Sequence, residues 1–168
     1  MSRTSAVGAA LVLLAAGAAD VHGQMFVSTG RDTLRGLPGV EVIVEGLQPE
    51  LERSGLTGAA IRADVERRLR DAGIEVYASQ TANPSPAKAY LYVHINALVL
   101  PQAAGYAIAV QVHLRQTVRS PVTGSNIVNA MTWDAQNVVG VPDSATQTVR
   151  AEVLTFIDQF VEDWASVH

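Results

Sequence analysis

Two long segments alternate between polar and apolar residues, and they constrain the fold more than any other feature of the sequence. In residues 90–100 the odd-numbered positions from Leu91 to Val99 are apolar, and in residues 106–119 the even-numbered positions from Ile108 to Leu114 are apolar. A period of two with many β-branched residues predicts half-buried strands. The short, glycine-ended segment between them predicts a hairpin. The chain therefore requires a sheet with one buried face.

Further strands are predicted over residues 40–45, 74–78 and 127–139, where β-branched residues again gather. In the last of these, the apolar phase comprises Ile127, Met131, Trp133 and Ala135. We expect Trp133 and Trp164 in the core. Because Asn129 falls on the same apolar phase, it should be hydrogen-bonded at a strand end or lie at a rim.

Two segments have apolar residues at helical spacing. Residues 58–72 carry Ile61, Val65, Leu69 and Ala72 on one stripe, with Thr57 placed to cap the first turn and Gly73 to end the helix. The final helix begins after Pro142-Asp143-Ser144 and runs to about Ala165. Its predicted buried stripe is Val149, Val153, Phe156, Phe160 and Trp164.

The acidic residues of the helix over residues 58–72 are expected on a solvated surface. Asp64 and Arg68 are four residues apart, as are Glu66 and Arg70. Such pairs stabilise a helix by ~0.2–0.5 kcal/mol each.

These elements follow the order β-α-β-β-β-β-α. That order predicts an α+β fold, a two-layer sandwich in which a mostly antiparallel sheet has its helices on one face. Residues 39–168 are expected to form a single domain, and the polar, glycine-punctuated residues 24–38 an N-terminal arm.

The N-terminal segment predicts export. Arg3 precedes the uncharged run from Ala6 to Ala19, which is too short to span a membrane but fits a secretory signal peptide over residues 1–23. Cleavage is expected after Gly23, or alternatively after Ala19. The protein is therefore expected in the periplasm or outside the cell, with a membrane contact only if this segment is retained.

Composition and motifs exclude several classes of function. A net charge of -4 argues against nucleic-acid binding, and the absence of cysteine removes thiol catalysis and Cys-type metal sites. No nucleotide-binding, hydrolase or metalloprotease motif occurs. We assign no catalytic residue and expect no cofactor.

The polar phase of the strands carries the candidate site. In an antiparallel pair, the residue numbers of directly opposed residues have a constant sum. If this sum is 207 for the first two long strands, His94 lies opposite His113. If it is 205, Tyr92 lies opposite His113 and the histidines are diagonal neighbours. A sum of 247 for the next pair places Asp134 opposite His113. Two histidines and a carboxylate can bind a divalent metal, so the candidate metal ligands are His94, His113 and Asp134.

The same polar phase is also a candidate protein interface, because aromatic residues and arginine are enriched at interfaces. The candidate partner-binding residues are Tyr90, Tyr92, His94, Gln111, His113 and Arg115.

Three stretches, LRGLPGVEVIVEGL, LTGAAIRADVERRLRDAGIEV and YLYVHINAL, resemble an uncharacterised group of secreted bacterial proteins. The resemblance covers about Leu34 to Trp164 and implies no activity. The order of elements is also similar to small periplasmic domains of envelope-assembly proteins and lipoproteins, a likeness of fold alone.

We therefore expect a non-enzymatic envelope protein, a binding or accessory module with a protein partner in the cell envelope. One version of this hypothesis is a subunit that docks on the periplasmic face of a membrane complex. The alternative is a metal-dependent or acid/base enzyme that uses His94, His113 and Asp134.

Overall fold

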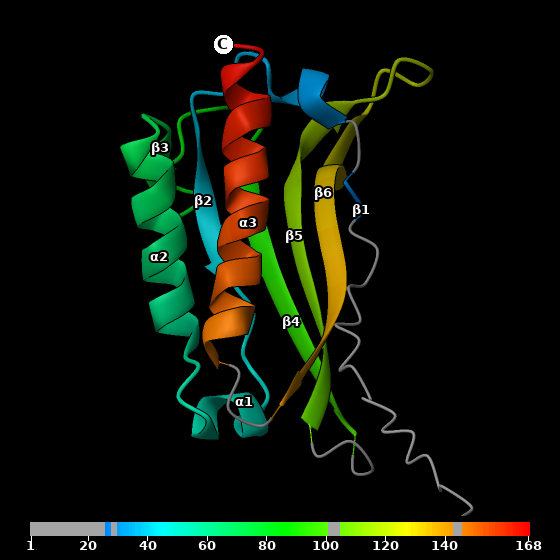
Figure 1. Cartoon of the computed structure of the whole chain (residues 1–168). Helices are drawn as coiled ribbons and strands as arrows, with labels where there is room; N and C mark the ends of the chain where they lie inside the picture. Colours follow the sequence, from blue (N-terminus) through cyan, green and yellow to red (C-terminus); the bar gives the residue numbers. More distant parts are fainter. Residues whose placement is uncertain (1–25, 28–29, 101–104, 143–145) are drawn as a thin grey trace, which may run out of the picture.

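The structure is a computed structural model that describes residues 26–27, 30–100, 105–142 and 146–168. It confirms the predicted α+β sandwich, in which helices lie on one side of a single sheet (Figure 1). The strands are β1 (Phe26–Val27), β2 (Gly39–Val44), β3 (Glu75–Tyr77), β4 (Tyr90–Leu100), β5 (Gly105–Arg119) and β6 (Asn126–Pro142). The helices are η1 (Gly30–Leu34, a 3-10 helix), α1 (Pro49–Arg53), α2 (Gly58–Asp71) and α3 (Thr146–Ala165).

The sheet has the strand order β1-β6-β5-β4-β2-β3. β2 runs parallel to both of its neighbours, β3 and β4, whereas the other pairs are antiparallel. The sequence does not show this arrangement, because β2 and β4 are separated by α1, α2 and β3. The parallel pairing carries the polar residues of β2 to the side of β4.

The core lies between the sheet and the pair α2 and α3, which pack side by side (Figure 1). The predicted apolar phases of β4 and β5 are buried, except that Ala97 is half-buried and Val99 is 52% exposed near the end of β4. Of the predicted α2 stripe, Ile61, Val65 and Leu69 are buried, but Ala72 is exposed because it lies at the end of the helix. All five residues of the predicted α3 stripe are buried, as are Trp133 and Trp164. The rings of Trp133 and Phe160 meet edge to face, with centroids 5.2 Å apart.

The prediction for the start of β6 was wrong. Ile127 and Met131 are 49% and 54% exposed, and only Trp133 and Ala135 of the predicted apolar phase are buried. The cause is a pair of register irregularities between β5 and β6, which place Met131 opposite Arg115. Extra residues in a bulge change which side of the sheet the following side chains face. Asn129, with φ of 57°, lies in this irregular stretch.

Part of the predicted N-terminal arm packs on the domain. β1 pairs with β6, and η1 follows it with Leu34 fully buried. A Cβ at Gly30 would lie 1.7 Å from the carbonyl oxygen of Thr132, so only glycine permits this approach. The predicted signal segment, residues 1–23, lies outside the described residues. No helix in the described part of the chain is long and apolar enough to cross a membrane.

Candidate functional site

The sheet surface that faces away from α2 and α3 is the candidate site, and we call it the open face. Within the described residues, no helix covers it (Figure 1). Strand registers arrange its side chains in rows that cross β2, β4, β5 and β6. It comprises Glu41, Ile43, Glu45, Tyr90, Tyr92, His94, Asn96, Leu98, Ala107, Ala109, Gln111, His113, Arg115, Asp134, Gln136 and Val138.

All six sequence-predicted partner residues belong to the open face. The observed register pairs Tyr92 with His113 and His94 with Gln111, which is the register with a sum of 205. His94 and His113 are therefore diagonal neighbours. His113 lies opposite Asp134, as the sum of 247 requires.

Glu45 organises one part of the open face. The Tyr92 hydroxyl donates a hydrogen bond of 2.6 Å to Glu45 Oε2, and His94 Nδ1 contacts the same oxygen. Because a carboxylate only accepts hydrogen bonds, the proton of neutral His94 is on Nδ1, and Nε2 accepts from the Asn96 amide. This chain of contacts holds two aromatic side chains in defined positions.

The same contacts shift two pKa values. The Tyr92 hydrogen bond, assisted by His94, holds the pKa of Glu45 below its ordinary value, while burial opposes the shift. In return, the hydrogen bond that the Tyr92 hydroxyl donates to Glu45 raises the pKa of Tyr92, and burial and the carboxylate charge act in the same direction. Glu45 was not among the predicted site residues. The alternation over residues 40–45 showed that Glu45 belongs to the polar phase, but the sequence did not show that this strand pairs with β4.

Arg115 and His113 form the second part of the site. The Arg115 guanidinium lies over the Tyr92 ring, 5.4 Å from its centroid. Burial lowers the pKa of His113, and the charge of Arg115 acts in the same direction, whereas Asp134 opposes it. His113 is therefore a mainly neutral imidazole at neutral pH.

Three atoms of the open face are excluded from water and have no hydrogen-bond partner among the described residues. They are Glu41 Oε2, His113 Nδ1 and Arg115 Nε. Polar atoms left unpaired away from water are costly, so most proteins contain few of them. All three unpaired atoms lie on the open face, on β2 and β5, the two strands that flank β4.

The candidate metal ligands are not gathered as a set. His94 turns to Glu45, and His113 and Asp134 lie on the neighbouring row. The described residues contain no group of three or more His, Cys, Asp or Glu side chains that could hold a metal ion. Metal titration in solution tests this candidate site.

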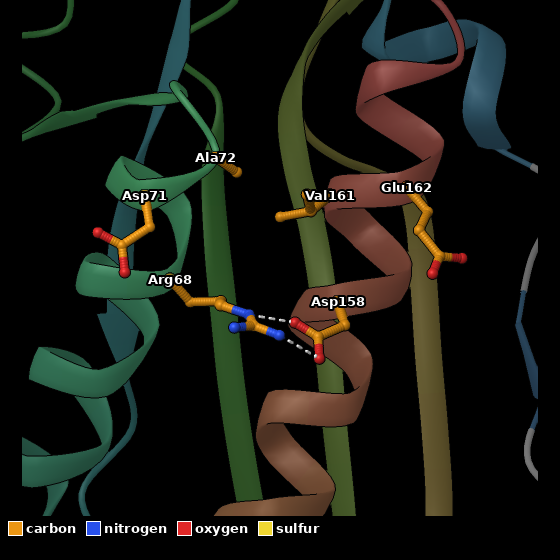
Figure 2. A pocket seen from close by; sticks show the side chains of 6 residues that line it. All are labelled: Arg68, Asp71, Ala72, Asp158, Val161 and Glu162. Carbon is orange, nitrogen blue, oxygen red and sulfur yellow. Dashed lines mark hydrogen bonds and ion pairs between the residues drawn. The ribbon is translucent and has the colours of Figure 1, made fainter.

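A shallow groove of about 330 Å³ lies on the opposite side of the molecule, between α2 and α3. Figure 2 shows Arg68 reaching across it to Asp158, with a distance of 2.8 Å from Nη2 to Oδ2. Asp71 of α2 and Glu162 of α3 line the two sides of the same groove (Figure 2). The central charges of this groove are already paired with each other, so we assign it to helix packing.

Two predictions for the acidic residues of α2 were wrong. Arg68 pairs with Asp158 of α3 rather than with Asp64. Asp64 is 7% exposed and binds Arg150 of α3 and Arg67. The reason is the packing of α3 along α2, which covers a surface that the sequence presents as solvated. The Glu66–Arg70 pair is present as predicted.

No family model and no curated protein sequence matches this chain. Among solved structures, the chain is similar to PelC from Paraburkholderia phytofirmans in two crystal forms, both described as dodecamers. One, a variant with a single leucine-to-methionine substitution, has 13% identity and a TM-score of 0.45, with 80% of this chain and 98% of that chain covered. The other has 17% identity and a TM-score of 0.43, with 79% and 96% covered.

Proposed function

We propose that this protein is a non-enzymatic binding or accessory module of the cell envelope and that the open face is its contact surface. The observation that carries the proposal is the open face itself, a polar and aromatic surface that no described helix covers. Its central side chains are held in place by hydrogen bonds before any partner arrives.

Side chains of the open face that are already fixed in the free protein favour binding, because less conformational entropy is lost when a partner binds. Fixing a flexible side chain at an interface costs ~0.5–1.5 kcal/mol, and Tyr92 and His94 have their positions set by Glu45. Tyrosine and arginine are also the residue types that most often carry the binding energy of protein interfaces. These properties support a protein partner rather than a small substrate.

The predicted export signal supports a location outside the cytoplasmic membrane. The run from Ala6 to Ala19 lies outside the described residues, and its composition and length are those of a secretory signal. In this setting the partner belongs to the envelope. A membrane complex with an exposed periplasmic surface is one such partner.

Site-specific photo-crosslinking tests the contact surface. A photo-reactive phenylalanine analogue replaces Gln111, which is half-buried on the open face, and in a matched strain it replaces Thr155, which is exposed on α3. In cells that make the protein naturally, we expect protein adducts from position 111 and few from position 155. Equal adducts from both positions, or none from position 111, would contradict the proposal.

A further inference from the structure

Glu41 and Arg115 lie in one row of the open face, on opposite sides of Tyr90. The strand registers pair Glu41 with Tyr90 and Tyr90 with Arg115. Neighbouring strands are ~4.7–4.9 Å apart, so the acidic and the basic residue stand at equal distances from β4. Opposite charges are thus placed symmetrically about the central strand of the face.

Neither charge is neutralised within the described part of the chain. The Glu41 side chain has no hydrogen bond or ion pair there, and Arg115, whose guanidinium lies over the Tyr92 ring, has no ion pair there either. One atom of each side chain is also hidden from water without a partner. Two complementary charges therefore remain available for a ligand that supplies the opposite sign to each.

A second copy of this chain supplies that combination. Consider a two-fold axis that runs parallel to β4, just above the open face. Rotation about this axis leaves the position of each residue along the strand direction unchanged and exchanges the two sides of β4. Glu41 of one copy then lies over Arg115 of the other copy, and the contact occurs twice. We infer that the open face packs on the same face of a second copy in this orientation. The inference rests on the proposed function, in which the open face is a contact surface.

The geometry agrees with known packing of sheets and symmetric dimers. Face-to-face sheets lie ~10 Å apart with their strands within about 30° of each other, and homodimers commonly use one surface patch twice. Residues of β4 on the axis then meet their own copies. One of them is Leu98, which is 66% exposed beside Ala107, so its apolar surface would be removed from water.

Charge reversal tests the arrangement on the full chain. We expect sedimentation equilibrium to show a wild-type dimer with a Kd in the micromolar range or tighter. Glu41→Arg and Arg115→Glu each create two like-charge contacts, which should raise Kd at least about 100-fold, since like charges that face each other at an interface repel. An equimolar mixture of the two variants restores opposite charges at both contacts, so it should form a mixed dimer with near wild-type affinity.

The controls separate folding and general charge effects from the specific contact. Glu52→Arg and Arg53→Glu make the same changes on exposed residues of α1 and should leave Kd unchanged. Circular dichroism and thermal melting establish that each variant folds. Leu98→Glu, at an exposed position, should weaken the dimer without a change of charge at residues 41 or 115.

The inference is overturned if the wild type stays monomeric up to about 100 µM, far above a micromolar Kd. It is also overturned if neither charge reversal raises the Kd of the dimer, or if the mixture of the two variants fails to associate. A monomeric wild type whose position 111 crosslinks to another envelope protein defeats the inference and leaves the proposed function standing. A monomer without crosslinks from that position defeats both.

Discussion

The buried carboxylate of Asp64 on α2 accepts a hydrogen bond of 2.9 Å from Nε of Arg150 on α3, which joins the two helices on the covered side of the sheet. Arg67 donates to the other carboxylate oxygen at 2.8 Å. The Arg150 hydrogen bond, supported by Arg67, holds the pKa of Asp64 below its ordinary value, while burial of the carboxylate opposes the shift. The contact is therefore formed by the ionised acid.

Asp64→Asn should lower the free energy of unfolding by about 1–3 kcal/mol, because it removes charged hydrogen bonds and leaves Arg150 without its acceptor. Urea denaturation at neutral pH measures the loss. Asp71→Asn, an exposed acid on the same helix, is the control and should change stability by less than about 0.5 kcal/mol. Equal effects from the two substitutions would show that the contact between the helices contributes nothing.

Asp64 should also contribute to the acid sensitivity of the fold. Its pKa is lower in the folded than in the unfolded state, so its stabilisation is complete above the unfolded value of about 3.9. The stabilisation is lost as the pH falls through the folded value, because the unfolded chain then binds more protons. In urea melts from pH 6 downward, Asp64→Asn should lose less stability than the wild type. A parallel pH dependence of the two proteins would refute the assignment.

His113 should titrate below its ordinary value of about 6.5, because burial and then the charge of Arg115 disfavour the imidazolium. The histidine then stabilises the fold above pH 6.5, and this contribution decreases as the pH falls toward the folded value. NMR titration of the His113 ring measures it directly. Arg115→Gln should raise the midpoint only in part, since burial is the larger cause. A wild-type midpoint at or above 6.5 would contradict the structure.

Phe160→Ala should cost about 3–5 kcal/mol, a large share of the ~5–15 kcal/mol expected for a domain of this kind. Phe160 is fully buried, and its ring packs against both Trp133 and Trp164. Denaturant melts measure the loss, with the exposed Thr155→Ala on the same helix as control. A cost under about 1 kcal/mol would mean that α3 is wrongly placed against the sheet.

Metal titration addresses the alternative, enzymatic hypothesis. His94 faces Glu45 and stands diagonal to His113, so we expect Zn²⁺, Ni²⁺ and Fe²⁺ to cause no saturable rise in melting temperature. A rise that saturates with metal concentration, and that disappears in His94→Ala and in His113→Ala, would establish the metal site.

Local pattern was sufficient for the long elements of this fold, but it did not predict β1, η1 or α1. The alternation in β4 and β5 follows from the two-residue period of a strand, and the α3 stripe follows from the 3.6-residue period of a helix. Thr57 accepts a hydrogen bond from the Ala60 amide, and Gly73 has the φ of 79° that a helix-ending glycine permits. Each of these features depends on residues within a few positions of one another.

Register and long-range pairing were decided only by the tertiary structure. The parity of the apolar positions allowed both register sums, and one of them would have placed the two histidines face to face. The observed sum of 205 separates them, while the parallel pairing of β2 with β4 places Glu45 beside Tyr92 and His94. A bulge, which local alternation does not reveal, turned Met131 outward.

Burial by another element was the remaining unknown. Asp64 and its arginine neighbours have the composition of a solvated surface, and they become an interhelical contact only because α3 packs along α2. The sequence by itself determined the long elements and, apart from the start of β6, their apolar faces, since periodicity records which side of each element avoids water. The tertiary structure alone decided which polar groups meet, because those meetings depend on strand order, register and helix placement across long separations in the chain.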